Sequence, residues 1–412
     1  MTGQGDFAEK LDKLARLAVH VGLGSVAGQE VVMTAPLDAV ALARRITHHA
    51  YAAGATVVTV LYNDDQAVLD RYETAGEASF DAAPAWLYEG MAAAFRSGAA
   101  RLAIVGEDPS LLSGQDPAKV ARANRARSIA YRPALDLIAR AAINWTIVAA
   151  ATPAWAKAAF PGLAEDAAVD ALWQAIFKAS RADGADPIAD WAVHNANLRA
   201  RCDLMNAKRY SALKFRGPRT DLEVGLADGH IWSGGASRSE NGIIYNANIP
   251  SEEIFTTPHR AGVNGTVTAT KPLSYQGTLI TDISVRFEGG AIVEAHASAG
   301  EDVLRRILET DEGARRLGEV ALVPHHSPIS NSGLLFYNTL FDENASCHIA
   351  LGQAYAKTVQ GADMMDGPGL IAAGINQSLI HIDWMIGSGD IDIDGIAADG
   401  AAEAVMRKGG WV

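Results

Sequence analysis

The N-terminal architecture follows from residues 29–62, which read QEVVMTAPLDAVALARRITHHAYAAGATVVTVLY. A short apolar run, Gln29 to Met33, precedes Pro36, which can open a helix that continues to about Ala53. A run rich in β-branched residues then covers Thr56 to Tyr62. Strand, helix and strand in this order indicate two parallel strands joined by a helical crossover.

The same alternation continues along the first half of the chain. We expect further strands at residues 101–105 and 144–149. The expected helices cover residues 84–96, 117–142, 166–180 and 187–208. The sequence therefore predicts an α/β N-terminal domain with a mostly parallel sheet, together with a helical extension, over residues 1–212.

The pattern changes near residue 212, where the apolar residues begin to alternate with period two. Leu222, Val224 and Leu226 are separated by polar residues or glycine, and residues 283–287 show the same alternation before a hairpin-like Gly289-Gly290 pair. A few helices, such as residues 301–308, interrupt the strands. We therefore expect an α+β C-terminal domain, rich in antiparallel strands, over residues 213–412.

The totals describe an ordinary globular chain. It has 412 residues, of which 49% are hydrophobic and 20% charged. The net charge of −13 and the lack of a basic run argue against nucleic-acid and anionic-membrane partners. Two cysteines, Cys202 and Cys347, are too few for a disulfide framework. Without a run of about 18 apolar residues or an apolar signal core, we expect a cytoplasmic protein with no membrane span.

Several common catalytic motifs are missing from the sequence. It has no HExxH metal motif, no GxxxxGK[ST] phosphate loop and no GxSxG nucleophile elbow. Seven of the eleven histidines lie after residue 212. Any metal or catalytic site is therefore expected in the C-terminal half, built from residues that folding brings together.

The clearest local signal is His381-Ile382-Asp383, inside an apolar run from Leu379 to Ile386. In a strand, residues i and i+2 share a face, so His381 and Asp383 point the same way. Imidazole and carboxylate are good ligands for zinc, manganese or cobalt, and a buried carboxylate is costly unless it is paired or metal-bound. Taken alone, the triplet is more often a hydrogen-bonded His–Asp pair in a core.

The other candidates each have a structural alternative. Glu319 opens the apolar run EVALV, where an acidic residue is often solvated at the rim of a sheet. Glu252-Glu253 follow Ser251, which could cap a helix that starts there. His348 and Tyr355 lie in or beside an apolar segment, where such residues are more often packed in a core. Composition and spacing do not decide between these readings.

Taken together, the segments resemble the thermophilic-type aminopeptidase family of metallopeptidases, the family of aminopeptidases T and S. The resemblance runs in order along nearly the whole chain, and the strand–helix–strand unit of residues 32–64 also fits it. The matching segments are NIPSEEIFTTP (Asn248 to Pro258), GEVALV (Gly318 to Val323), NASCHIALGQAY (Asn344 to Tyr355), HIDWMIGS (His381 to Ser388), INWTIVAAATPAWAKAAFP (Ile143 to Pro161) and GPRTDLEVGL (Gly217 to Leu226).

The resemblance implies a metal-dependent aminopeptidase that acts on peptides with a free N-terminus. It implies two divalent ions (Zn, Co or Mn) in the C-terminal domain, and a homodimer. Tyr355 corresponds to a tyrosine placed at the metal centre, and Glu252 stays a helix-start residue. The implied metal ligands are Glu253, Glu319, His348, His381 and Asp383.

A hydrolytic mechanism is consistent with these assignments. Two ions would lower the pKa of a bridging water. Glu319 is then the candidate proton carrier, and Tyr355 the candidate hydrogen-bond donor to the tetrahedral oxyanion. Two alternatives remain at this point. One is an iron-dependent ring-cleaving dioxygenase of the same fold, which would need a single Fe(II). The other is a non-catalytic binding protein.

Overall fold

The computed structural model describes residues 2–275 and 278–412. The chain divides into two compact units. Unit 1 comprises residues 1–194 and 236–250, and unit 2 comprises residues 195–235 and 251–412. The division falls inside one long helix, α8 (Pro187–Lys208). The domain boundary expected at residue 212 stays a prediction.

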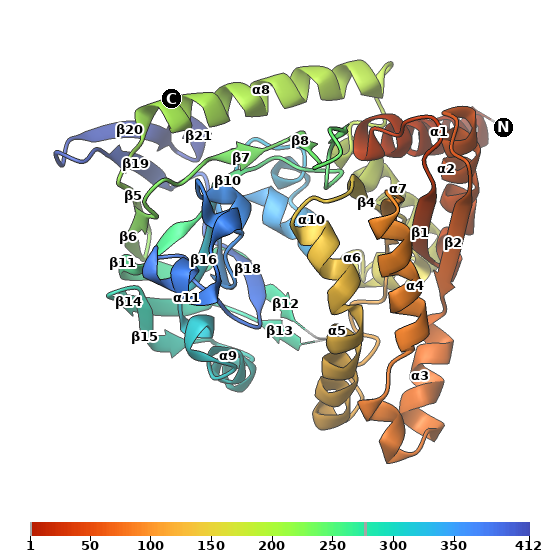
Figure 1. Ribbon diagram of the computed structural model, residues 1–412, viewed down its shortest axis with the longest axis horizontal. Coiled ribbons are helices and arrows are strands. Elements are labelled where there is room, and N and C mark those ends of the chain that lie inside the picture. The colour runs from red at the N-terminus through yellow and green to blue at the C-terminus, as the bar shows by residue number, and fades with distance from the viewer. Residues whose placement is uncertain (1, 276–277) are drawn as a thin grey trace. The chain divides into compact units, whose positions relative to one another are not determined.

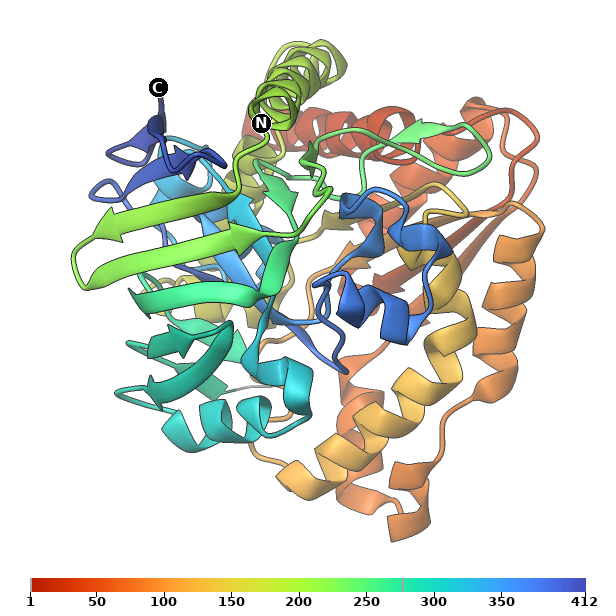
Figure 2. The same cartoon turned by 60° about the vertical axis from the view of Figure 1, so that its left-hand side comes forward.

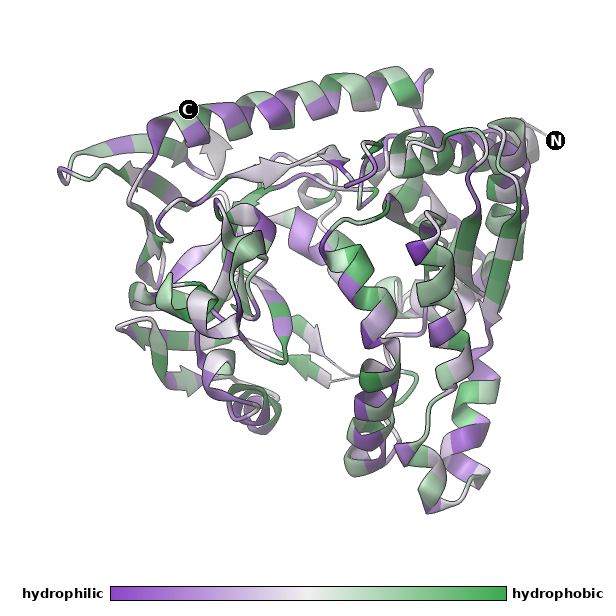
Figure 3. Cartoon of the chain, viewed as in Figure 1, coloured by the Kyte–Doolittle hydropathy of each residue, from purple (hydrophilic) through white to green (hydrophobic). Residues whose placement is uncertain are grey.

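Unit 1 is built around a four-stranded parallel sheet of order β2-β1-β3-β4 (Figure 1). Its strands are β1 (Val31–Pro36), β2 (Val58–Asn63), β3 (Ala100–Val105) and β4 (Trp145–Ala149). β1 is almost entirely buried and appears as a hydrophobic arrow in Figure 3. Strands of this kind need cover from helices, because a parallel sheet is apolar on both faces.

Helices connect and cover these strands, as the alternation in the sequence predicts. Helices α4 (Ala85–Arg96) and α5 (Pro117–Ala139) pack Met91, Phe95, Leu137 and Ile138 against Val32 of β1. The two remaining strands of the unit form a small hairpin, β8 (Ser237–Arg238) and β9 (Ile244–Tyr245). The helices of the unit are α1 (Thr2–Leu17), α2 (Val40–Ala52), α3 (Asp65–Thr74), α4 (Ala85–Arg96), α5 (Pro117–Ala139), α6 (Pro153–Ala159), α7 (Glu165–Ala179) and the first part of α8.

Unit 2 contains two main antiparallel sheets and a small two-stranded one. The larger has eight strands, of order β15-β14-β11-β6-β5-β19-β20-β21, and Figure 2 shows β5, β6 and β11 lying side by side. Its strands are β5 (Ala212–Gly217), β6 (Thr220–Leu226), β11 (Pro258–Thr268), β14 (Ser284–Glu288), β15 (Ala291–His296), β19 (Asp392–Ile396), β20 (Ala402–Arg407) and β21 (Gly410–Trp411).

A second sheet of unit 2 has five strands, of order β18-β17-β16-β10-β7. Its strands are β7 (Ser233–Gly234), β10 (Ile254–Thr256), β16 (Leu317–Leu322), β17 (His348–Gly352) and β18 (His381–Met385). The remaining elements are the hairpin of β12 (Leu273–Tyr275) and β13 (Thr278–Ile280), and the helices α9 (Glu301–Leu308), α10 (Thr339–Asp342) and α11 (Gly367–Ala372). Among the described residues, no helix is both long and apolar enough to cross a membrane.

One hydrophobic core serves both sheets of unit 2. The eight-stranded sheet contributes residues such as Phe215 and Val224, and the five-stranded sheet contributes Val320, Ile349 and Trp384. All five side chains are less than 2% exposed. Because side chains alternate along a strand, each core residue of the five-stranded sheet places its neighbours on the opposite face of that sheet. The candidate site lies on that opposite face.

Candidate metal centre

Three adjacent strands carry four of the predicted ligands: Glu319 on β16, His348 on β17, and His381 and Asp383 on β18. The register places Glu319 opposite Ala350 of β17, and Ala350 opposite Asp383. Residues that are directly opposite across a sheet project from the same face. The small methyl group of Ala350 therefore separates two carboxylates and leaves space above the middle strand.

The row of Glu319, Ala350 and Asp383 depends on a close approach of two backbone segments just before Glu319. The pairing of β16 with β17 is irregular between Leu317 and Glu319, which marks a bulge at Gly318. A Cβ atom at Gly318 would lie only 2.3 Å from the backbone oxygen of Gln353. Glycine is thus required where β16 enters the site, and the bulge sets the face on which Glu319 projects.

Glu253 reaches the site from the segment that precedes β10. The backbone N–H of Glu252 donates a hydrogen bond of 2.6 Å to Oδ1 of the buried Asn344. Residues 251–253 are not helical, so the prediction that Ser251 caps a helix and that Glu252 starts it is wrong. The Glu252 N–H is held by Asn344, and Ile254, two residues later, pairs in a sheet with Leu322 and Gly234, so Glu253 is fixed between these two anchors.

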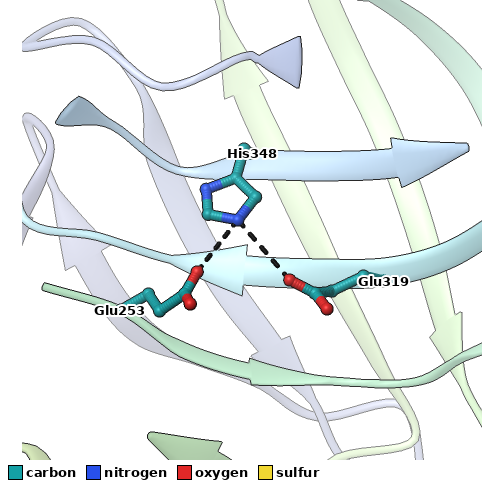
Figure 4. A group of neighbouring side chains, drawn as sticks. All are labelled: Glu253, Glu319 and His348. Carbon is teal, nitrogen blue, oxygen red and sulfur yellow. Dashed lines mark ion pairs between the residues drawn. The ribbon is translucent and has the colours of Figure 1, made fainter. Parts of the chain in front are cut away.

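The five predicted ligands form two overlapping groups, in each of which the candidate ligand atoms lie within 4.8 Å of one another. In the first group, Nε2 of His348 lies 3.0 Å from Oε2 of Glu253 and 3.5 Å from Oε1 of Glu319 (Figure 4). In the second, Nε2 of His381 lies 3.5 Å from Oδ1 of Asp383 and 4.0 Å from Oε2 of Glu319. Glu319 belongs to both groups, and a different oxygen faces each histidine.

Both histidine rings are oriented by backbone carbonyls. Nδ1 of His348 lies 3.2 Å from the oxygen of Ser346, and Nδ1 of His381 lies 2.7 Å from the oxygen of Gln353. A carbonyl can only accept, so each Nδ1 carries a proton and each Nε2 is left to face the carboxylates. Metal-binding histidines typically have this arrangement, with the second ring nitrogen donating to a carbonyl or carboxylate.

Charge and burial show that the group is unsatisfied by the protein alone. Among the described residues, Oε2 of Glu253 and Oδ1 of Asp383 are buried and have no hydrogen-bond partner, and each lies in an ion-pair contact with an imidazole. Burial alone would lower the pKa of His348, but Glu253 and Glu319 raise it well above its usual value. In the same way, Asp383 and Glu319 outweigh burial and raise the pKa of His381 to about 10. Buried carboxylate oxygens without hydrogen bonds, facing the Nε2 atoms of two imidazoles, are a set of ligands that suits a divalent cation.

The structure adds an acidic residue that the sequence did not single out. Glu343 follows α10 and lines the same small cavity as Asp383. Burial raises its pKa well above the usual value, and the charges of Asp383 and Glu253 raise it further. Asp342 fixes this segment by accepting hydrogen bonds from the N–H groups of Phe336 and Asn338. The only sequence signal was an acidic residue shortly before His348, which is too weak to separate from a solvated loop.

Tyr355 stands beside the second group. Its ring centroid is 4.8 Å from that of His381 and 6.2 Å from that of Phe255. Burial raises the pKa of Tyr355 well above its usual value, and the surrounding carboxylates, Glu319 first, add to the shift. Its hydroxyl therefore keeps its proton at neutral pH and can donate a hydrogen bond. The residue as a whole is 36% exposed, so Tyr355 lies at the edge of the site.

The comparisons with known proteins identify the family. The family model described as "Thermophilic metalloprotease (M29)" matches residues 7–411. The chain belongs to this family. Aminopeptidase T of Thermus thermophilus is 53% identical over 406 residues, which cover 98% of this chain and 99% of the relative. Aminopeptidase AmpS of Bacillus subtilis is 44% identical, with 98% and 99% covered.

The fold of this M29 chain is also that of a solved relative. The structure of wild-type AmpT from Thermus thermophilus has a TM-score of 0.94 and 52% identity, and the match covers 98% of this chain and 100% of that one. The expected combination of a parallel sheet and an antiparallel-rich region is confirmed. The family and its named relatives also confirm the prediction of a metal-dependent aminopeptidase. They give no support to the dioxygenase or the non-catalytic alternative.

Proposed function

We propose that the chain removes N-terminal residues from peptides with the help of two divalent ions, Zn, Co or Mn, held by Glu253, Glu319, His348, His381 and Asp383. The observation that carries this proposal is the shared position of Glu319, whose two oxygens face the two histidine groups separately. A carboxylate placed between two groups of ligands is suited to bridge a pair of ions.

The ligand chemistry supports each assignment. Glu253 and His348 would hold one ion, His381 and Asp383 the other, and Glu319 would contact both. Glu343 adds a further carboxylate next to Asp383. The surplus of carboxylates over imidazoles favours hard or borderline divalent cations. When bound, such ions lower the pKa of a water molecule and polarise a carbonyl group.

The remaining chemistry falls to the side chains of the chain. Hydrolysis joins a water oxygen to the scissile carbonyl carbon, breaks the C–N bond and transfers a proton to the leaving amine. We assign this proton transfer to Glu319 on the condition that it is not fully engaged as a ligand; burial and the charges of Glu253 and Asp383 raise its pKa, although contact with His348 opposes the shift. The Tyr355 hydroxyl, which keeps its proton, is placed to donate a hydrogen bond to the oxyanion.

Substrate selection follows from the acidity of the site. Four carboxylates, Glu253, Glu319, Glu343 and Asp383, surround two imidazoles. We therefore propose peptides with a free N-terminal amine as substrates, in accordance with the names of the relatives. The expected homodimer and cytoplasmic location also stay proposals, and sedimentation velocity of the purified chain tests the first of them.

The decisive experiment is hydrolysis of leucyl-p-nitroanilide by metal-stripped protein that has been reloaded with Co²⁺, Zn²⁺ or Mn²⁺. We expect cleavage only with metal and only with the free amine, so N-acetyl-leucyl-p-nitroanilide serves as the blocked control. Elemental analysis of the active sample should give two ions per chain. Cleavage of the blocked substrate at the same rate, or no cleavage of any residue in a wider N-terminal panel, would remove the aminopeptidase proposal.

A further inference from the structure

The ring of Tyr355 separates a lysine, Lys357, from the candidate metal centre. Lys357 belongs to a short helical turn, residues 356–358, just after Tyr355. Its Nζ is 5.5 Å from the ring centroid of Phe255 and 5.7 Å from that of Tyr355. The Tyr355 ring in turn contacts His381. Lys357 is exposed as a residue, and its ammonium group lies over two aromatic rings.

This ammonium group has no carboxylate partner in the part of the chain that the structure describes. The carboxylates of Glu253, Glu319 and Asp383 are instead directed at His348 and His381. Burial lowers the pKa of Lys357 below its usual value, and the charges of Glu319 and Glu253 oppose this shift without reversing it. An aromatic face attracts a cation without using its N–H donors. All three donors of Lys357 are thus available to an anion beside an otherwise acidic site.

We propose that Lys357 is a specificity-determining residue, which binds a carboxylate on the peptide residue that follows the scissile bond. This inference rests on the proposed aminopeptidase function. If the substrate amine and the scissile carbonyl lie at the metal centre, the next residue extends outward past Tyr355. One extended residue spans about 3.5 Å, so a carboxylate on it would lie roughly one residue length from the reacting carbonyl.

Two kinds of peptide offer a carboxylate at this place. In a dipeptide it is the C-terminal carboxylate, and in a longer peptide it is the side chain of Asp or Glu at the second position. An acidic site repels either group, and a cation at the edge of the site offsets this repulsion. Three substrates distinguish these two sources. Leucyl-glycine has a terminal carboxylate, leucyl-aspartamide has one on its side chain, and leucyl-glycinamide has none.

The test compares Lys357→Met with the wild-type enzyme, both loaded with the same metal. For each we measure the ratio of kcat/KM on leucyl-glycine or leucyl-aspartamide to that on leucyl-glycinamide. In Lys357→Met we expect at least one ratio to fall about tenfold, mainly through KM, as loss of a charged hydrogen bond predicts. Lys357→Arg, which keeps the charge, should retain most of the preference. Lys408→Met, at an exposed lysine between β20 and β21, is the matched control and should keep the wild-type ratios.

The outcomes are distinct. If the wild type cleaves all three substrates and Lys357→Met lowers kcat/KM on them equally, the lysine has only a structural role and the inference is overturned. The same follows if neither ratio changes. If the loaded wild-type enzyme cleaves none of them or any other free N-terminal substrate, the proposed function itself fails, independently of Lys357.

Discussion

At the scale of single residues, hydrogen bonds behind the candidate ligands orient the site. Ser346 and Gln353 contribute only their backbone oxygens, yet these oxygens decide which nitrogen of His348 and His381 faces the carboxylates. A ring rotated by half a turn would lose its hydrogen bond to the carbonyl and turn Nδ1 instead of Nε2 toward the carboxylates. The orientation is fixed before any cation binds, which reduces the reorganisation that binding requires.

Tyr355 offers the cleanest test at this scale. Tyr355→Phe removes the hydroxyl and keeps the ring that contacts His381 and Phe255. We expect kcat to fall by roughly 100-fold, the usual effect of removing one oxyanion donor, with the number of bound ions unchanged. Steady-state kinetics on leucyl-p-nitroanilide and elemental analysis together measure both quantities. Unchanged turnover would refute a catalytic role, and loss of an ion would assign the hydroxyl to metal binding instead.

At the scale of elements, the register of three strands creates the site. Glu319, Ala350 and Asp383 form a row, and a shift of one residue in β17 or β18 would turn the ligands toward the core. The core prevents such a shift, because Ile349 and Trp384 fill it from the other face. Asn344 connects two segments that lie outside the sheet. Its Oδ1 accepts a hydrogen bond from the N–H of Glu252, and its Nδ2 donates one to the backbone oxygen of Leu340.

Ala350→Leu tests the importance of the row. The new side chain would occupy the space between the carboxylates of Glu319 and Asp383, so we expect metal affinity to fall at least tenfold and activity to fall with it. Overpacking should also lower the free energy of unfolding by about 1–3 kcal/mol. Isothermal titration with Zn²⁺ and urea denaturation measure the two effects.

The matched control for Ala350→Leu is Ala212→Leu. Ala212 is a buried alanine on β5, in the other sheet of unit 2. The control should show a comparable loss of stability with normal metal binding. If Ala350→Leu binds Zn²⁺ as tightly as the wild type does, the methyl group of Ala350 is not what keeps the site open.

At the scale of the whole molecule, the site couples folding to metal and pH. Without a cation, the carboxylates are balanced by protons on the imidazoles, as the raised pKa of His381, about 10, indicates. A group whose pKa is higher in the folded state stabilises the fold below its unfolded pKa, and this contribution is lost as pH rises toward the folded value. The metal-free protein should therefore lose stability between about pH 6.5 and pH 10.

Metal binding has the opposite dependence, because it requires neutral imidazoles and displaces their protons. We therefore expect the difference in Tm between the Zn²⁺-loaded and the metal-free protein to widen as pH rises from 6.5 to 9. Thermal unfolding followed by circular dichroism, with excess Zn²⁺ or with a chelator, gives both curves. A difference that narrows over this range would show that these histidines do not bind the ion.

The sequence predicted the elements of the fold well where patterns are local. Residues 187–208 and 301–308 are helices with the predicted bounds, and the parallel and antiparallel regions follow the change in period near residue 212. The prediction failed at Ser251 and Glu252, where the expected helix start is absent and the N–H of Glu252 donates a hydrogen bond to Asn344. Glu252 and Asn344 are far apart in sequence, so no local rule could reveal their contact.

For the site, the sequence by itself determined the types of ligand and, through resemblance, which residues to consider. Periodicity could also show that His381 and Asp383 share a face, because that depends on one strand alone. Only the tertiary structure decided that Glu319 faces both histidine groups, that Glu343 joins the carboxylates, and that Lys357 lies over Tyr355 and Phe255. These relations depend on strand register and loop paths, which are set by packing between residues distant in sequence.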